Sequence, residues 1–402
     1  MKWGCLMLRR LFACSLLSVT IGCAGEVVGP PAAEQSATKF WEAGATVRWN
    51  AIAREETRAG TLNVFTGARM LTYLSLAQYQ AAVTTKKAND RGEHASIAAA
   101  VGGASAALLS AAPFFPARAA FFEAELAAHA GPQWPGEAHQ DFAAGEAIGR
   151  SIAAEVLARA ASDGFTPSNV GVTVPVCAGC WFSAPGLLPV FPRLSEMRPF
   201  FLMSSDQFRP SPPPAFGSAA FLSALAEVRH FSDTRTPEQD ASAKFWALPN
   251  GYAVIPAYNY QVASEEIVRF HLDELRAAHT LALMGMASMD AFIACHDAKY
   301  TYWLIRPSQA DPGITLSVPL PNFPAYPSNH ACITGASMAV LASLFPSDGG
   351  RLNGLADDAA LSRVVGGIHY RFDGDVGLAL GRQVAAWAIQ NDVDGKAAFV
   401  IE

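Results

Sequence analysis

The sequence predicts a mainly α-helical protein, and three observations point to this class. Alanine-rich stretches repeat apolar side chains at helical spacing. No stretch of useful length alternates apolar and polar residues as a half-buried strand does. The proline-rich stretches lie between the helical ones, where proline breaks no helix. With 402 residues, of which 51% are hydrophobic and 16% charged, the chain can bury a sizeable core and is neither disordered nor collagen-like.

The N-terminus reads as an export signal. Lys2, Arg9 and Arg10 precede an apolar stretch at 11–21, which is too short to span a bilayer as a helix. We therefore assign 1–22 to a signal peptide. The residues ending at Cys23 resemble a bacterial lipoprotein box, so we expect acylation of Cys23, with ordinary cleavage nearby as the alternative. The expected location is the periplasm or the cell envelope, with a lipid anchor at Cys23 as the membrane attachment.

The first half of the mature chain, residues 36–163, is expected to be a helical bundle. Ser36 is a suitable N-cap for its first helix, which would run to Gly60. The expected helices that follow lie at about 64–88, 94–111, 115–130 and 135–162.

Residues 164–215 change in character, because repeated prolines prevent long helices and ladder-forming strands. Loops of this length are often functional lids or binding loops, and an ordinary proline-rich wrap over the bundle is an equal alternative. Residues 216–392 form the C-terminal core, interrupted by a second proline-rich stretch at 307–327. Its expected helices lie at 216–231, 236–247, 262–305, 330–345, 355–364 and 375–390.

Two cysteines, Cys177 and Cys180, lie within the proline-rich region. In an exported protein they favour a local disulfide, with two unpaired residues as the alternative. A zinc site is disfavoured because no second Cys or His pair accompanies them.

The formal charge of −6, with no run of Lys or Arg, argues against nucleic acid as the main partner, since a phosphate-tracking surface needs clustered positive charge. Any anion must be bound locally. Three segments of the C-terminal third gather the groups for this purpose.

The first segment runs from Lys299 to Arg306-Pro307, and seven helical residues bring the two cations to one face. The second is Tyr326-Pro327-Ser328-Asn329-His330, a helix start that offers N–H groups, a hydroxyl and an imidazole to an oxyanion. The third runs from Ser362-Arg363 through Gly366-Gly367 to His369 and Asp373, and adds a third cation and a His–Asp pair. The glycines at 374, 377 and 381 follow at helical spacing, which favours close helix packing over a nucleotide loop.

Spaced as Lys-x6-Arg-Pro, Pro-Ser-x-His and Ser-Arg-x5-His-x3-Asp, these segments resemble the signature of the superfamily of type 2 phosphatidic acid phosphatases (PAP2) and vanadium-dependent haloperoxidases. Trp49-Asn50, the segment 206–210 and Asp290-Ala291 are similar to the bacterial exported haloperoxidase branch. The resemblance implies a helical bundle with long proline-rich loops that holds phosphate or vanadate among the three segments.

The roles that the resemblance implies fall on the matching positions. Lys299, Arg306 and Arg363 would neutralise the oxyanion, and Ser328 and the backbone N–H of Asn329 would donate hydrogen bonds to it. His369 would be the vanadium ligand or the nucleophile toward phosphorus, and His330 the acid/base.

Elementary chemistry agrees with these roles. A buried oxyanion needs compensating charge and donors, and a carboxylate such as Asp373 can fix the imidazole of His369. Asn329 departs from the family pattern, which commonly has glycine there. Asparagine keeps the N–H, but its side chain would crowd or hydrogen-bond the ligand. His296, one turn before Lys299, either lines the pocket or is an ordinary exposed or packed histidine of the helix.

The sequence therefore favours a vanadate-dependent haloperoxidase that oxidises bromide or iodide with hydrogen peroxide. The first alternative is an acid phosphatase that hydrolyses phosphomonoesters through a phosphohistidine and needs no cofactor. The second is a non-catalytic lipoprotein that binds oxyanions. The halide, the phosphoester, any organic acceptor and the oligomeric state are not determined by these motifs.

Overall fold

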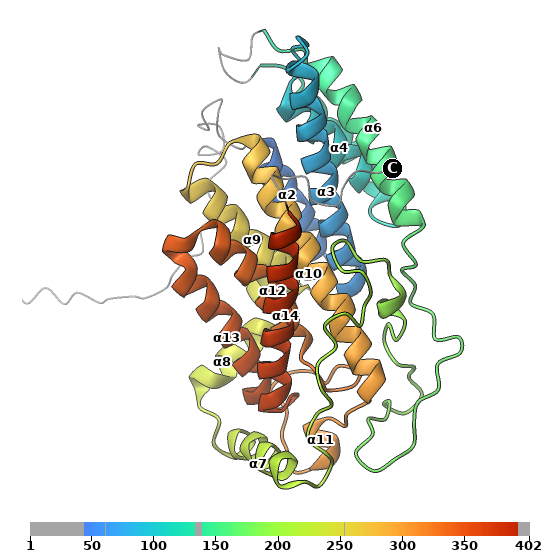
Figure 1. Ribbon diagram of the computed structural model, residues 1–402, viewed down its shortest axis with the longest axis vertical. Helices are drawn as coiled ribbons and strands as arrows, with labels where there is room; N and C mark the ends of the chain where they lie inside the picture. The colour runs from blue at the N-terminus through green and yellow to red at the C-terminus, as the bar shows by residue number, and fades with distance from the viewer. Residues whose placement is uncertain (1–43, 61, 133–138, 253, 393–402) are drawn as a thin grey trace, which may run out of the picture. The chain divides into compact units, whose positions relative to one another are not determined.

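The structure is a computed structural model that describes residues 44–60, 62–132, 139–252 and 254–392 (Figure 1). The predicted signal peptide, Cys23 and the predicted N-cap Ser36 lie outside these residues. Within them the mainly α prediction is confirmed: helices are joined by irregular loops, and the only β-structure of the described chain is two isolated bridges, Ala95 with Asp141 and Cys180 with Leu304.

Three of the N-terminal helices carry side-chain caps that fix where they start. Asn63 accepts hydrogen bonds from the backbone N–H groups of Phe65 and Thr66, and Ser96 and Asp141 cap their helices in the same way. The helices of this part are α2 (Ala45–Arg58), α3 (Val64–Asn89), α4 (Ile97–Leu109), the 3₁₀ turn η1 (Pro116–Arg118), α5 (Ala119–Ala127) and α6 (Phe142–Ala161).

The C-terminal core contains the helices that carry the three motifs. They are α7 (Ala219–Thr234), α8 (Pro237–Ala247), α9 (Ile255–Arg269), α10 (Glu274–Tyr302), α11 (Pro307–Ala310), α12 (Asn329–Leu344), α13 (Gly349–Val365) and α14 (Arg371–Asn391), with 3₁₀ turns at Leu194–Glu196, Pro249–Gly251 and Pro346–Asp348. Most boundaries lie within a few residues of the predicted ones.

One predicted helix is wrong. The apolar stretch at 262–305 is not continuous, because the chain breaks between α9 and α10. His271 adopts a left-handed backbone conformation with φ of 53°, and the Asp273 carboxylate then caps α10 by accepting from the N–H of Arg276 at 2.8 Å. The apolar periodicity runs across this break, so it does not reveal it. Helix α13 likewise starts at Gly349, six residues before its predicted start.

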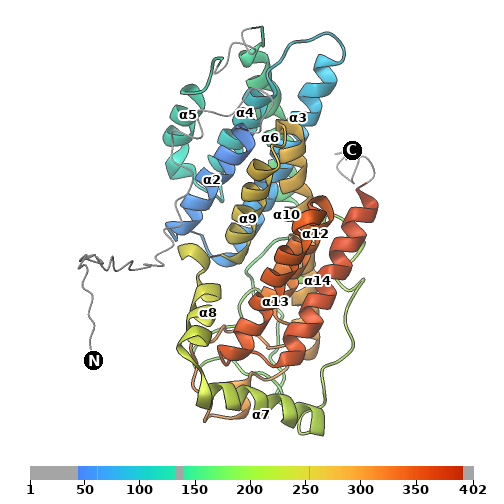
Figure 2. The ribbon, with the colours of Figure 1, turned by 90° about the vertical axis from the view of Figure 1, so that its left-hand side faces the viewer.

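Helix α10 runs through the core between the N-terminal helices and the C-terminal ones (Figures 1 and 2). By length and apolar composition this helix could cross a membrane. However, 94% of its apolar 18-residue stretch is buried inside the protein, as expected for a core helix. Gly285 allows close approach by α9, because a Cβ there would lie 1.8 Å from the hydroxyl of Tyr260.

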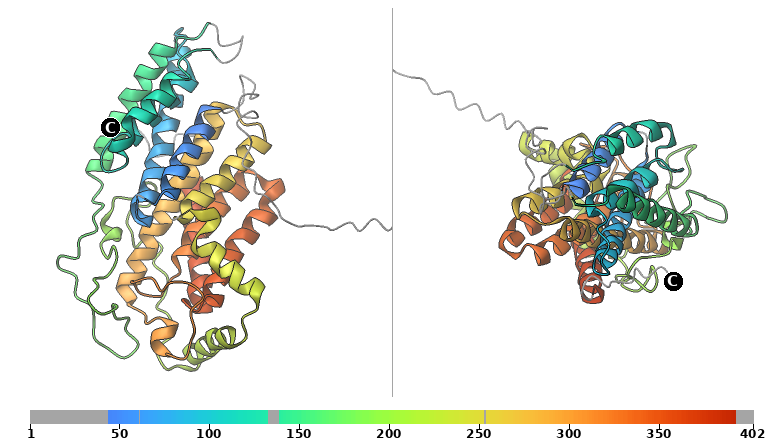
Figure 3. Two further views of the ribbon diagram at one scale, coloured as in Figure 1. Left: turned by 180° about the vertical axis from the view of Figure 1, so that it is seen from behind. Right: turned by 90° about the horizontal axis from the view of Figure 1, so that it is seen from above.

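The proline-rich segment 164–215 contains no α-helix and lies along α10, as the view from behind shows (Figure 3). The buried carboxylate of Asp290 on α10 holds it by accepting from the backbone N–H groups of Phe200, Phe201 and Leu202 at 2.6–3.0 Å. Cys177 and Cys180 form a disulfide within this segment, which excludes the zinc alternative.

Helices α12 and α14 pack closely because of glycine, as predicted. A Cβ atom on Gly377 would lie 2.9 Å from the carbonyl oxygen of Ser328, and one on Gly381 would lie 2.3 Å from that of Cys332. Both distances are too short for a side chain, so glycine is required where α14 crosses the start of α12.

Candidate functional site

Four helix ends carry the residues of the three motifs. Lys299 lies in the last turn of α10, Ser328 at the start of α12, Arg363 in the last turn of α13, and His369 two residues before α14. These four helices lie side by side, with α7 across the end at which the motifs lie (Figure 2). The fold thus brings 299, 328, 363 and 369 to one end of the core.

His369 is held in a defined tautomer. Its Nδ1 lies 2.8 Å from Oδ2 of Asp373, and Nη1 of Arg306 lies 3.0 Å from its Nε2. A carboxylate accepts and a guanidinium donates, so Nδ1 carries the proton and Nε2 presents its lone pair. Burial lowers the pKa of His369 well below its usual value, and Arg306, Lys299, His330 and Arg363 lower it further. The imidazole is therefore neutral and suited to ligate or attack through Nε2.

Asp373 is fixed from both directions. Its Oδ2 also accepts from the backbone N–H of Tyr370 at 3.1 Å, and its own carbonyl accepts from the N–H of Ser328 at 2.9 Å. Burial raises the pKa of Asp373 to about 7, while Lys299 and Arg306 oppose that shift. One residue thus joins the second motif to the third.

The start of α12 offers unused hydrogen-bonding groups. Ser328 is fully buried, yet its hydroxyl caps nothing and has no hydrogen-bond partner in the structure. The first N–H groups of any helix lack intrahelical acceptors, so those of Asn329 and the residues after it also point out of the helix end. Arg306 adds a further donor, because its buried Nη2 has no partner.

The ammonium group of Lys299 donates its hydrogen bonds to backbone carbonyls. Its ammonium group donates to the carbonyls of Pro324 at 3.0 Å, Ala325 at 2.9 Å and Pro327. Three donors are thereby used on the chain that precedes Ser328. Lys299 consequently contributes positive charge to the site while it shapes the turn into α12.

Arg363 and His330 both contact the last turns of α8, which the sequence motifs do not mark. Arg363 donates to the carbonyl of Ala243, and Nε2 of His330 lies 2.9 Å from the carbonyl of Trp246. A carbonyl only accepts, so Nε2 of His330 carries a proton and its Nδ1 remains free to accept one. The negative end of the α8 dipole thus faces a site cation and the predicted acid/base.

The site carries excess positive charge. Lys299, Arg306 and Arg363 are at most 1% exposed. The carboxylate of Asp373 lies near the first two cations, and that of Asp358 lies near Arg363. Burial lowers the pKa of Lys299 to about 8, of Arg306 to about 10 and of Arg363 to about 9. Three buried cations beside a single buried carboxylate are costly, and a bound multivalent anion would relieve that cost.

An aromatic wall lies against two of these cations. The ring centroid of Phe323 is 5.0 Å from Nζ of Lys299 and 5.1 Å from Cζ of Arg306. His296 is fully buried and its ring lies 5.8 Å from that of Phe323, so it packs beside the site instead of being exposed. Sequence spacing gave no signal for Phe323, which lies in a proline-rich loop.

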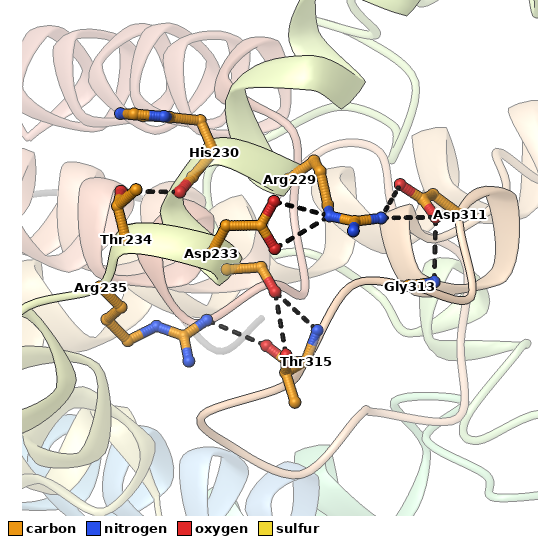
Figure 4. Close-up of polar contacts among 9 residues, drawn as sticks. Arg229, His230, Asp233, Thr234, Arg235, Asp311, Gly313 and Thr315 are labelled. Carbon is orange, nitrogen blue, oxygen red and sulfur yellow. Dashed lines mark hydrogen bonds and ion pairs between the residues drawn. The ribbon is translucent and has the colours of Figure 1, made fainter.

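Helix α7 braces the loop that joins the first two motifs (Figure 4). Arg229 pairs with Asp311 at 3.2 Å, and the Ser232 hydroxyl accepts from the N–H of Thr315 at 2.7 Å. Arg235 donates to the carbonyl of Thr315 at 3.0 Å and to that of Val365 at 2.8 Å. The last contact joins this loop to the segment that leads to His369.

These residues fit a tetrahedral oxyanion. Unpartnered buried donors on Ser328 and Arg306, free helix N–H groups and three cations match its charge and its acceptor oxygens. In the part of the chain that the structure describes, no group of three or more His, Cys, Asp or Glu side chains could hold a metal cation. The site is therefore suited to vanadate or phosphate and not to a bare metal ion.

Comparisons with known proteins bear on the family and the fold. Residues 278–394 match the model of the PAP2 superfamily. A bacterial vanadium-dependent iodoperoxidase superposes with a TM-score of 0.73 at 23% identity, covering 86% of this chain and 95% of that one. An apo-type bacterial vanadium-dependent chloroperoxidase superposes with a TM-score of 0.69 at 15% identity, covering 84% of this chain and 96% of that one. No curated protein matches the chain in sequence.

The fold and the match together define the class: an all-α protein whose residues 278–394 match the PAP2 superfamily. Within that class, the chain has the fold seen in bacterial vanadium haloperoxidases, as the sequence motifs predicted. The family and the fold support an enzyme. At these identities the likeness does not extend to a particular halide or reaction.

Proposed function

We propose that this protein is a vanadate-dependent haloperoxidase that oxidises bromide or iodide with hydrogen peroxide to hypohalous acid. The observation that carries the proposal is the neutral His369, whose Nε2 lone pair lies among three buried cations and unpartnered donors. The net reaction consumes hydrogen peroxide, halide and one proton and yields hypohalous acid and water.

Vanadate would be held by Nε2 of His369, with its oxygens neutralised by Arg306, Arg363 and Lys299 and hydrogen-bonded by Ser328 and the N–H of Asn329. When bound, it supplies a Lewis-acidic centre that activates hydrogen peroxide without a change in its oxidation state. Arg306 now donates to Nε2 of His369, so this guanidinium must turn part of its donor set toward the oxyanion.

His330 is the proposed proton carrier, through Nδ1. Burial lowers its pKa well below the usual value, and Arg363, Lys299 and Arg306 add to this effect. A bound oxyanion would cancel much of that repulsion and raise the pKa of His330 toward the range useful for acid/base catalysis. Binding of the oxyanion would thereby favour the protonated form of His330, which can then act as the proton donor.

The second candidate is an acid phosphatase, which the superfamily match favours. In that reaction Nε2 of His369 attacks phosphorus, His330 protonates the leaving oxygen, and water then hydrolyses the phosphohistidine. The same neutral imidazole and cation clamp serve both reactions, so the geometry alone does not separate them.

The sign of the vanadate effect distinguishes the two. Metal-free protein is assayed for bromide and iodide oxidation by hydrogen peroxide and for hydrolysis of a generic phosphomonoester, with increasing vanadate. A haloperoxidase gains halide oxidation, because vanadate is its cofactor. A phosphatase loses hydrolysis, because vanadate mimics the transition state. Phosphoester turnover that falls with vanadate, without halide oxidation, would overturn the haloperoxidase proposal.

The variant His369→Ala is the matched control for both assays. Removing the ligand or nucleophile costs several powers of ten in turnover in either mechanism. Near-normal turnover in His369→Ala would contradict both candidates. His279→Ala, a change at a histidine near the other end of α10 that pairs with Asp392, should leave turnover unchanged.

A further inference from the structure

One buried pair of side chains at the site has no part in the proposed reaction. His296 lies on α10, one turn before Lys299, and Asn329 begins α12. Nδ1 of His296 lies 3.2 Å from the carbonyl of Phe191, and its Nε2 lies 3.1 Å from Nδ2 of Asn329. Since the carbonyl only accepts, Nδ1 carries the proton and Nε2 is an acceptor.

This arrangement orients the carboxamide of Asn329. Its NH₂ group must face His296, because an imidazole lone pair accepts only from a donor. The carboxamide oxygen therefore points elsewhere, and Oδ1 has no hydrogen-bond partner although Asn329 is only 8% exposed. Buried acceptors almost always receive a hydrogen bond in native proteins, so we expect Oδ1 of Asn329 to accept one from a donor outside the protein.

The residue that carries the unpartnered oxygen lies beside the cation clamp. Asn329 directly follows Ser328, whose hydroxyl is also buried and unpartnered. His296 packs on Phe323, the ring that lies 5.0 Å from Lys299 and 5.1 Å from Arg306. A ligand that satisfies Ser328 and Arg306 would therefore lie next to Asn329 and could supply its missing donor.

We propose that Oδ1 of Asn329 accepts a hydrogen bond from a protonated oxygen of the bound oxyanion, and that His296 is the positioning residue that keeps this oxygen turned to the ligand. The site would then prefer oxyanions that retain a proton at neutral pH, such as phosphate and vanadate, over sulfate, which retains none. The inference rests on the proposed oxyanion site and adds its selectivity.

The preference is diagnostic because charge alone predicts the opposite. At pH 6, sulfate carries more negative charge than phosphate, so a clamp of cations and donors would bind sulfate at least as well. A carbonyl oxygen facing the ligand repels an unprotonated oxygen and attracts an O–H group. One hydrogen bond of this kind corresponds to about tenfold in affinity.

The test is calorimetric titration of the full mature chain at pH 6 with inorganic phosphate and with sulfate. The wild type should bind phosphate at least about tenfold more tightly than sulfate. Asn329→Gly should lose this preference while it still binds sulfate. His296→Phe should lose it as well, and His296→Gln should restore part of it, because a glutamine oxygen can accept from Nδ2 of Asn329.

A merely structural role for His296 would weaken both anions equally and leave the ratio unchanged, which would contradict its positioning role. His279→Phe, on the same helix but paired with Asp392, should keep the wild-type ratio. Sulfate binding as tight as phosphate in the wild type would overturn the inference while leaving the oxyanion site intact. If neither phosphate nor sulfate nor vanadate binds the wild type, the proposed function fails as well.

Discussion

At the scale of single residues, the site is defined by which hydrogen-bonding groups are used and which are not. Lys299 has its donors on backbone carbonyls, and His369 has its Nδ1 on Asp373. Three buried polar groups have no hydrogen-bond partner: the Ser328 hydroxyl, Nη2 of Arg306 and Oδ1 of Asn329. Some polar groups thus stabilise the structure of the site, and others remain available to bind a ligand.

Asp373→Asn should separate binding from turnover. The carboxylate orients the imidazole of His369, so its loss should lower turnover by roughly 10–100-fold. The same change removes a negative charge near the cations, so phosphate affinity should be unchanged or higher. Steady-state kinetics and phosphate titration check the two effects, with Asp357→Asn, at an exposed pair with Arg382, as control. Loss of phosphate binding without loss of turnover would contradict the assigned role.

Lys299 should make oxyanion affinity depend on pH. Burial lowers its pKa to about 8, so the ammonium is charged below that pH and loses its proton above it. Sulfate affinity, measured because sulfate keeps its charge throughout, should therefore fall above pH 8 by up to about tenfold per pH unit. Lys299→Met should bind more weakly and lack the break near pH 8. A break of the same size in that variant would assign it to another group.

At the scale of elements, close helix contact sets the position of Ser328. Gly377 on α14 faces the backbone at the start of α12, where a Cβ would lie 2.9 Å from the Ser328 carbonyl and 2.8 Å from Cβ of Ala331. Backbone cannot move aside as a flexible side chain can. The helices themselves must separate if this glycine is replaced.

Gly377→Ala should therefore destabilise the protein by about 1–3 kcal/mol through overpacking and weaken phosphate binding by displacing Ser328. Gly354→Ala on α13 is the matched control, because nothing lies within 4 Å of its added Cβ. That change should stabilise the protein by up to about 1 kcal/mol. Denaturant unfolding and phosphate titration measure both. Equal effects of the two substitutions would refute the packing argument.

The helix boundaries differ in how well the sequence predicts them. Helices with clear apolar periodicity, such as α3 and α12, are predicted nearly to the residue, because this signal is local. The break at 270–273 was not, since it depends on a left-handed His271 and a cap by Asp273 inside a continuous apolar pattern. The start of α13 at Gly349-Gly350 is not predicted, because glycine lowers helix propensity.

At the scale of the whole described chain, the three motifs meet because consecutive core helices run in opposite directions. The end of α10, the start of α12, the end of α13 and the start of α14 thereby share one end of the core. The motif spacing predicted the residues of the site but not its surroundings. Phe323 and the carbonyls of α8 carry no sequence signal, because they contact the site through the tertiary fold.

In the proposed site, Lys299, Arg306 and Arg363 form a buried clamp for a tetrahedral oxyanion. The most direct measurement is thermal unfolding of wild type and Arg306→Met with increasing vanadate. A ligand that binds only the folded state at 100 times its Kd stabilises it by about 2.7 kcal/mol, so the wild-type unfolding temperature should rise with vanadate and that of Arg306→Met should not. An unfolding temperature that vanadate leaves unchanged in the wild type, or raises equally in both, would contradict the account.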